Sequence, residues 1–315
     1  MAGDYSAATV ATLRADLAGL RLDLALAKAF PQYSRARLQA WLKSGCVKVS
    51  RAGEPLRVAG RTLVLGGEQV ELSPPEIADA ATPPAQRLPL AIVYEDRDLM
   101  VIDKPAGLVV HPGAGNPDRT LMNALLAHAP SLRAVPRAGI VHRLDKDTSG
   151  LMVVAKNLEA QAALVRQLAA RSVQRTYLAL VCGEPPERGA IDAPVGRDTR
   201  SRIRMAVTRR GKDARTRYRV LDRFRAGKNA AALIECRLET GRTHQIRVHL
   251  QHIKHPVIGD PIYRRGVRQG IEFPRQALHA SELALEQPKS GKAMRWKAPL
   301  PADMKKLLAK LRRER

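Results

Sequence analysis

Acidic and hydroxyl side chains gather in the stretch HRLDKDTSG, at residues 142 to 150. Four of its residues fall at positions 1, 3, 5 and 6 of an EF-hand calcium loop: Asp145, Asp147, Ser149 and Gly150. Position 12 of such a loop needs a bidentate Glu and here holds Lys156, which argues against calcium. A phosphatase-type DxDx[TS] motif also fits the letters, but it needs an unbroken apolar strand before the first Asp, and His142-Arg143 interrupts that strand.

Asp145 lies in a predicted turn between IVHRL and the apolar run LMVVA, where a carboxylate can project into a cleft. The neighbouring cations Arg143 and Lys146 favour its ionised form. An ionised carboxylate can act as a nucleophile or as a general base. A structural Asp in a salt bridge is the alternative that a lone Asp leaves open.

The charge of the chain indicates a polyanionic partner. Its 315 residues include 54 Lys and Arg against 30 Asp and Glu, which gives a net charge of +24 and a pI near 10.8. Such an excess favours contacts with phosphates. Aromatic residues make up only 3% of the chain, so broad stacking platforms for single strands are not expected. Recognition of RNA through its shape and backbone is expected instead.

The sequence has no apolar run of the ~18 residues that a membrane span needs and no secretory signal pattern at its N-terminus, so a cytoplasmic protein is expected. The three cysteines are widely spaced, which argues against disulfides and CxxC metal sites: Cys46, Cys182 and Cys236. Four histidines lack the HExxH pattern, so no metal is expected: His244, His249, His252 and His255.

Residues 18–72 are predicted to form a small module with helices at 20–30 and 35–45 and strands at 46–50, 62–66 and 68–72. Ser34 is a candidate cap for the second helix. That helix has a basic outer face formed by Arg35, Arg37 and Lys43. The proline-rich segment 73–88 is interpreted as a linker.

Residues 89–315 alternate strands with unevenly placed helices, which predicts an α+β domain. Strands are expected at 90–95, 98–104, 150–156, 175–183, 216–224 and 231–239, and helices at 120–129, 157–172, 243–253 and 301–315. Between Arg197 and Lys228 the chain has 13 Arg or Lys and three Asp, which predicts a phosphate-binding face along a β ribbon.

Four motifs in order carry a resemblance: DKPAGLVVHPG, HRLDKDTSG, RTYLALVCG and LETGRTHQIRVHLQHIKHPVIGDPIY. With them, the chain resembles the RluA-type pseudouridine synthases, which detach a uracil in RNA and reattach it through carbon. The resemblance implies a catalytic domain at 89–315 with a mixed, mainly antiparallel sheet and a central cleft, and it implies no cofactor. The N-terminal module similarly resembles the small RNA-binding fold of the fourth small-subunit ribosomal protein.

The resemblance also implies roles for individual residues. Asp145 matches the essential nucleophile, Tyr177 the tyrosine that lies against the target uracil, and Arg247 the basic partner of the Asp. Arg143 matches the side chain that enters the base stack when the nucleotide is extruded. Further substrate contacts are implied at His142, Thr148, Arg242 and His244.

The implied substrate is 23S ribosomal RNA, free or within an assembling large subunit, at uridines of the helix 69 hairpin loop, and the protein is expected to be a monomer. Arg119 and Arg264-Arg265 stand where the family commonly has Gly, and Arg51-Ala52-Gly53 replaces a common Asn-Gly. Two alternatives remain: a non-catalytic ribosome-assembly factor that binds RNA, and a pseudouridine synthase that acts on transfer RNA.

Overall fold

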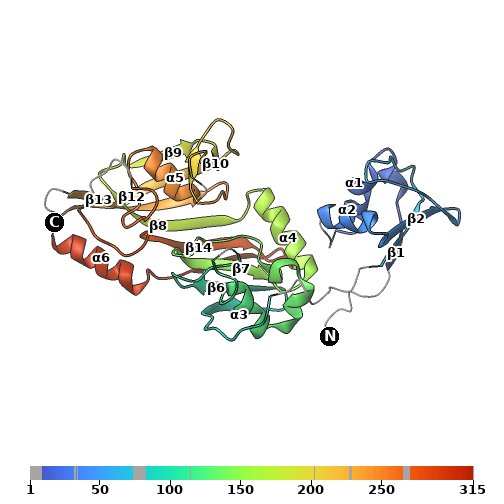
Figure 1. The fold of residues 1–315 in the computed structure, drawn as a ribbon, viewed down its shortest axis with the longest axis horizontal. Helices are drawn as coiled ribbons and strands as arrows, with labels where there is room; N and C mark the ends of the chain where they lie inside the picture. The colour runs from blue at the N-terminus through green and yellow to red at the C-terminus, as the bar shows by residue number, and fades with distance from the viewer. Residues whose placement is uncertain are drawn as a thin grey trace.

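The computed structural model describes residues 9–31, 33, 35–73, 83–113, 115–201, 203–226, 229–264 and 270–314. Within these ranges, residues 9–72 build a four-stranded sheet with two helices, and the rest of the chain builds a nine-stranded sheet. Figure 1 shows the first unit in blue and the strands of the second as one twisted layer. No helix in the described ranges is long and apolar enough to cross a membrane.

The N-terminal unit orders its strands β1-β4-β2-β3. Its elements are β1 Thr9–Thr12, α1 Leu22–Ala29, α2 Arg35–Lys43, β2 Val47–Arg51, β3 Glu54–Pro55 and β4 Gln69–Leu72. Because β1 pairs with β4, the sheet begins upstream of residue 18, the expected start of the module. The strand predicted at 62–66 was wrong, since there Leu63 makes only an isolated bridge to Arg21. The proposed cap Ser34 lies outside the described residues.

The hairpin between β2 and β3 keeps a two-residue turn although Asn-Gly is replaced there. Ala52 and Gly53 both have positive φ, 49° and 85°. This is the backbone that a type I′ turn requires, and Asn or Gly adopts it more readily than Ala. Arg119 likewise has a φ of 53°, which explains why Gly is common at its position.

The segment interpreted as a linker is described from residue 83 onward, and residues 74–82 lie outside the described ranges. Its last part is hydrogen-bonded to the larger unit. The Gln86 amide donates to the Asn123 carbonyl, and Asn123 Nδ2 donates to the Pro84 carbonyl at 2.7 Å. The linker assignment stays a prediction.

The larger sheet orders its strands β5-β6-β7-β14-β8-β13-β12-β9, with β15 on β14. The strands are β5 Ile92–Glu95, β6 Leu99–Lys104, β7 Ser149–Ala155, β8 Gln174–Cys182, β9 Arg188–Asp192, β12 Arg215–Ala226, β13 Asn229–Leu238, β14 Leu278–Glu286 and β15 Ala293–Lys297. A separate ribbon joins β10 Val195–Arg197 to β11 Met205–Val207. The pairing of β7 with β14 is parallel and its flanking pairings are antiparallel, which confirms the α+β class with a mixed, mainly antiparallel sheet.

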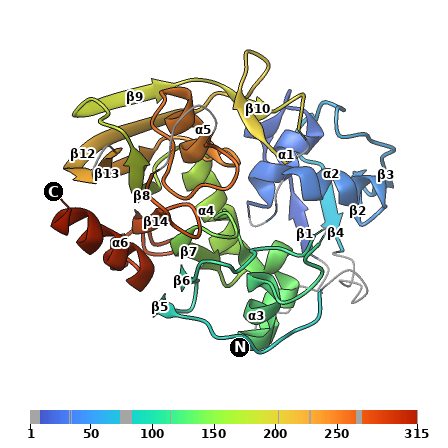
Figure 2. The ribbon, with the colours of Figure 1, turned by 60° about the vertical axis from the view of Figure 1, so that its left-hand side comes forward.

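Helices cover both faces of the sheet, so β7 is buried along its whole length. The helices are α3 Leu121–His128, α4 Leu158–Ala169, α5 Gln245–His252 and α6 Ala302–Arg313. Leu121 and Leu125 of α3 belong to the cluster that includes Met152, whereas Leu164 of α4 belongs to the cluster with Val153 on the other face. Figure 2 shows α5 and α6 near strands β8, β12 and β13.

The basic stretch after Arg197 forms a strand with alternating faces, as predicted. Tyr218 of β12 pairs with Cys236, which pairs with Tyr177 of β8, so these three side chains share one face. Arg217 pairs with Arg237 on the opposite face. Before the register shift at Val220–Asp222, the cations Arg215, Arg217 and Arg219 therefore project away from the face that carries Tyr177.

Candidate active site

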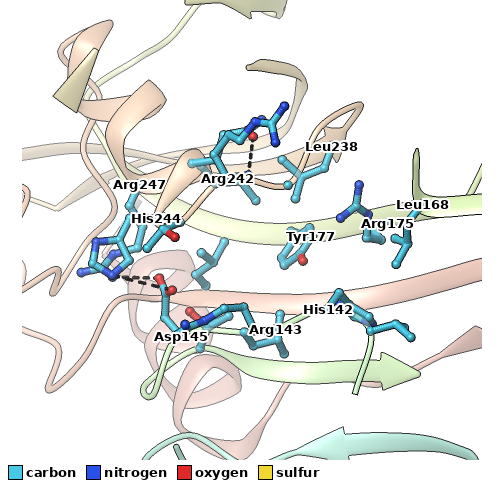
Figure 3. A pocket seen from close by; sticks show the side chains of 18 of the residues that line it. His142, Arg143, Asp145, Leu168, Arg175, Tyr177, Leu238, Arg242, His244 and Arg247 are labelled. Atoms are coloured by element: carbon cyan, nitrogen blue, oxygen red, sulfur yellow. Dashed lines mark hydrogen bonds and ion pairs between the residues drawn. The ribbon is translucent and has the colours of Figure 1, made fainter. Parts of the chain in front are cut away.

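Three elements that are distant in sequence bring Asp145, Tyr177 and Arg247 to one pocket of about 400 Å³. Asp145 comes from the loop before β7, Tyr177 from the middle of β8 and Arg247 from the first turn of α5. In the sheet, β7 and β8 flank β14, so the loop and the strand lie close together. Figure 3 shows Asp145 facing Arg247. The pocket lies within the range of about 300–1,000 Å³ that small-molecule sites span.

Two consecutive ion pairs, Asp260–Arg247 and Arg247–Asp145, orient the Asp145 carboxylate. Arg247 Nη1 donates to Asp145 Oδ2 at 2.8 Å, while Arg247 Nε and Nη2 donate to Asp260 at 2.6 and 3.0 Å. Asp260 is fully buried, and it also accepts the backbone N–H groups of Ile262 and Tyr263. Burial disfavours the charge on Arg247, but the hydrogen bonds and charges of Asp260 and Asp145 outweigh it, so the pKa of Arg247 is raised. The guanidinium is therefore a permanent cation that orients the Asp145 carboxylate.

His244 is a second neighbour of Asp145. Its Nε2 lies 3.8 Å from Asp145 Oδ1, and its Nδ1 lies 2.8 Å from the hydroxyl of Tyr263. That hydroxyl accepts the Met205 N–H, so its own proton is free to point to Nδ1. Burial lowers the pKa of His244, against the opposing effect of Asp145. His244 has a left-handed φ of 57° at the N-terminus of α5, a strained position of the kind found at functional sites.

Tyr177 is only 5% exposed and lines the pocket from β8. Burial raises the pKa of its hydroxyl, the Arg175 charge opposes this, and the Asp145 charge adds to it. The phenol is thus protonated near neutral pH and is able to donate a hydrogen bond. Its ring offers an apolar face to a planar ligand.

Hydrogen bonds made by Thr148 and Lys104 fix the loop that carries Asp145. The Thr148 amide donates to the Asp145 carbonyl at 3.1 Å, and Thr148 Oγ1 accepts from Gln276. The buried Lys104 ammonium donates to the carbonyls of Pro105, Leu108 and Lys146 at 2.7, 2.9 and 2.9 Å. Thr148, predicted to contact substrate, is 2% exposed and lines the pocket.

The other residues expected to contact substrate also line the pocket: His142, Arg143, Arg242 and His244. His142 Nε2 accepts the Val153 N–H at 3.1 Å, and burial together with the Arg175 charge lowers its pKa to about 3. Its ring is therefore neutral. Arg143 is exposed at the pocket mouth, and Arg242 Nε donates to the Asp213 carbonyl at 3.0 Å.

The predicted RNA-binding residues of the N-terminal unit lie apart from this pocket, on α2. Arg35 and Arg21 both bind the buried carboxylate of Asp23, with Nη2 distances of 2.6 and 3.0 Å. Burial disfavours the charge on Asp23, but the hydrogen bonds from Arg35, Gln39 and Arg21 prevail and lower its pKa to about 2. Lys43 is exposed in the last turn of α2, and the side chain of Arg37 lies outside the described ones.

The histidines considered as metal ligands have other partners. His249 is buried, with Nδ1 on Thr216 Oγ1 and Nε2 on the Ala193 carbonyl, both at 2.9 Å. His255 Nδ1 lies 3.0 Å from the Cys182 carbonyl. Across the described ranges, no group of three His, Cys, Asp or Glu side chains is arranged as a metal site. Ser149 and Gly150, which would be positions 5 and 6 of a calcium loop, instead begin the buried strand β7.

Sequence reasoning missed several residues of the site. Asp260 and Tyr263 lie in a motif that was noted, but their contacts with Arg247 and His244 were not expected. Arg137 lines the pocket from a turn in which Arg137, Ala138 and Gly139 all have positive φ. Arg175 lines it beside Tyr177.

Comparisons with known proteins give the family of the chain. Residues 98–252 match the family model described as RNA pseudouridylate synthase. The chain is 52% identical to the ribosomal large subunit pseudouridine synthase D of Nitrosomonas europaea, over 96% of this chain and 87% of that protein. It is 48% identical to the protein of that name in Escherichia coli O157:H7, over 96% and 94%. The solved human RNA pseudouridylate synthase domain containing 1 is similar in fold, with a TM-score of 0.55 and 29% identity over 73% of this chain and 97% of that one.

Proposed function

Since the chain belongs to the RNA pseudouridylate synthase family, we propose that it converts uridines of large-subunit ribosomal RNA to pseudouridine. The names of the most similar curated relatives support ribosomal RNA as the substrate. The helix 69 hairpin loop is the proposed target within 23S RNA. The net charge of +24 suits an RNA partner, free or in an assembling subunit.

The observation that carries this proposal is the Asp145 carboxylate, 17% exposed in the pocket and held at 2.8 Å by Arg247. A fixed, ionised carboxylate is suited to attack the sugar or the base of a bound uridine, or to take a proton from the sugar. In each route the N1–C1′ bond breaks and a C5–C1′ bond forms. N1 gains a proton and C5 loses one, so no cofactor is consumed.

The other residues of the pocket fit the steps around bond cleavage. The Tyr177 ring is positioned to lie against the detached uracil, and its neutral hydroxyl can pass a proton. The uracil must turn without escaping, and the walls formed by Leu144, Ile246 and Leu278 exclude water from that movement.

Arg143 is proposed to replace the extruded nucleotide in the base stack. It is exposed, adjoins the pocket and lies two residues from Asp145. Extrusion of a base costs a few kcal/mol, and a planar guanidinium can restore part of the lost stacking. The Arg35 and Lys43 side chains of α2 are proposed to bind RNA phosphates outside the pocket.

Mapping of pseudouridines tests this function. The purified protein is incubated with unmodified 23S transcript and, separately, with unmodified transfer RNAs, and the products are located by carbodiimide labelling and primer extension. Pseudouridines in the helix 69 loop are the expected result. If only transfer RNA is modified, transfer RNA and not 23S RNA is the substrate. If the protein binds these RNAs but modifies none of them, the assembly-factor alternative is favoured.

A further inference from the structure

Arg175 differs from the other deeply buried arginines of the protein. Within the described ranges, three arginines are less than 10% exposed: Arg175 at 9%, Arg247 at 3% and Arg275 at 7%. Arg247 binds Asp145 and Asp260, and Arg275 binds Asp303 as well as backbone carbonyls. For Arg175, none of the described residues supplies a hydrogen bond or an ion pair, and its Nε is shielded from solvent without a partner.

The guanidinium of Arg175 faces the pocket, beside Tyr177. Arg175 lies two residues before Tyr177 on β8, so both side chains project from the same face of the strand into the pocket. Figure 3 shows them side by side, on the pocket wall opposite His142. The cation is therefore placed where the target base is proposed to lie.

Gly241 leaves room for this guanidinium. A Cβ at residue 241 would lie 2.6 Å from Arg175 Nη1, whereas the backbone φ of Gly241 is outside the left-handed region. The small size of Gly241 therefore lets the flexible end of the Arg175 side chain occupy this space.

The described part of the chain places no carboxylate in an ion pair with Arg175. Among the described residues that line the pocket, the single carboxylate is Asp145, which Arg247 already engages. The other neighbours, His142 and Tyr177, are neutral. Burial of an unpaired cation costs several kcal/mol, a cost that a ligand oxygen can offset when it binds.

We propose that Arg175 binds an oxygen of the target nucleotide, either on the phosphate that flanks it or on the uracil ring. This inference rests on the proposed function, since it assigns the ligand of the same pocket. A guanidinium suits either acceptor because its planar fork can donate two parallel hydrogen bonds. Arg175 then completes substrate binding beside Tyr177, while Arg247 serves Asp145.

The first test measures binding separately from turnover. In an Asp145→Asn background, Arg175→Gln is expected to weaken the binding of a target hairpin by about 10–100-fold, the range for a lost charge-assisted hydrogen bond. Arg295→Gln removes the same charge from the exposed strand β15, which does not line the pocket, and is expected to change affinity by less than about 3-fold. Equal affinities for Arg175→Gln and its parent would overturn the inference.

Stability separates this role from a structural one. Arg175→Met removes the unpaired charge and keeps an unbranched side chain, so its urea midpoint without RNA is expected to equal or exceed that of the wild type. A lower midpoint would identify a structural role. Arg175→Lys is expected to recover part of the affinity, because it restores the charge without the fork.

Modified hairpins distinguish the two sources of the oxygen. If the phosphate is the ligand, a neutral methylphosphonate beside the target uridine weakens wild-type binding and adds nothing to the loss in Arg175→Gln. If the uracil is the ligand, 2-thio- or 4-thiouridine shows this non-additive behaviour instead. Product formation by the wild-type protein is scored separately, so absence of product rejects the proposed function and leaves the binding result to decide the role of Arg175.

Discussion

Arg247 Nη1 donates a 2.8 Å hydrogen bond to Asp145 Oδ2 across 102 residues of sequence, and the same guanidinium is held from behind by the fully buried Asp260. The carboxylate in the pocket is thus oriented by a group that cannot turn away without breaking a buried ion pair. This arrangement fixes the position of the reactive Asp145 carboxylate before any RNA binds.

Asp145→Asn is expected to reduce pseudouridine formation by about 10³-fold or more, because the amide is neither a nucleophile nor a base at neutral pH. RNA affinity should remain near that of the wild type. Asp147→Asn is the matched control, since this neighbouring carboxylate does not line the pocket, and it should keep activity within a few-fold. Single-turnover assays on the same transcript measure both, and an active Asp145→Asn variant would refute the assignment.

Asp260→Ala is expected to lower the free energy of unfolding by about 3–5 kcal/mol, because it leaves Arg247 partly unpaired in the interior. Asp16→Ala breaks the exposed Arg14–Asp16 pair and should change it by less than about 1 kcal/mol. Urea unfolding of both variants measures the difference. Similar losses for the two would show that Asp260 does not stabilise a buried charge.

Tyr177→Phe keeps the ring and removes the hydroxyl, so hairpin affinity should be retained. If the hydroxyl passes a proton, product formation should fall by about 10²–10⁴-fold. Tyr177→Leu also removes the aromatic face and should weaken binding in addition. Dissociation constants and single-turnover rates separate the two effects, and wild-type rates for Tyr177→Phe would exclude a proton-transfer role.

The lowered pKa of His142 makes the free energy of unfolding depend on pH. Its pKa is about 3 in the folded protein and near 6.5 in the unfolded chain, so only the unfolded chain binds this proton between those values. The contribution of the neutral ring is complete above pH 6.5 and is lost toward pH 3, by at most about 1.4 kcal/mol per pH unit. The stability of the wild type relative to His142→Gln should therefore decrease between pH 7 and pH 4. Urea unfolding at several pH values checks this, and a constant difference would contradict it.

Gly150→Ala is expected to cost more than about 4 kcal/mol or to prevent folding. Its φ is +113°, and a Cβ would lie 2.3 Å from the Ala280 carbonyl oxygen of the paired strand β14. Gly107 also has a positive φ, +87°, but a Cβ there meets no atom within 4 Å. Gly107→Ala should therefore cost only the backbone strain of about 1–2 kcal/mol. Urea unfolding compares them, and equal costs would show that the contact with β14 is unimportant.

Much of the fold follows from local patterns. The predicted helices agree with α3, α4, α5 and α6 within a few residues, because apolar side chains recur at helical spacing and Thr120 and Asn157 mark two of the starts. Strands such as β6 and β7 were found as apolar runs. The strand β14 was missed, since its central position in the sheet is set by tertiary pairing and Glu282 and Glu286 give it a mixed pattern.

Only part of the site was predictable from the sequence. Motif resemblance identified Asp145, Tyr177 and Arg247, and the structure places all three at one pocket. It did not reveal Asp260 as the partner of Arg247 or Arg175 as an unpaired cation, because burial and counter-charge are properties of the folded chain. The outward direction of the β12 cations was likewise hidden, since alternation alone does not say which face meets the core.

Arg217 and Tyr218 are consecutive in β12, yet one belongs to the cationic surface and the other to the buried face. One residue inserted or deleted between Arg215 and Val220, before the register shift of this strand, would exchange these two sets and force guanidinium groups into the interior. We therefore expect this part of β12 to tolerate substitution of its exposed arginines far better than insertion or deletion of a residue.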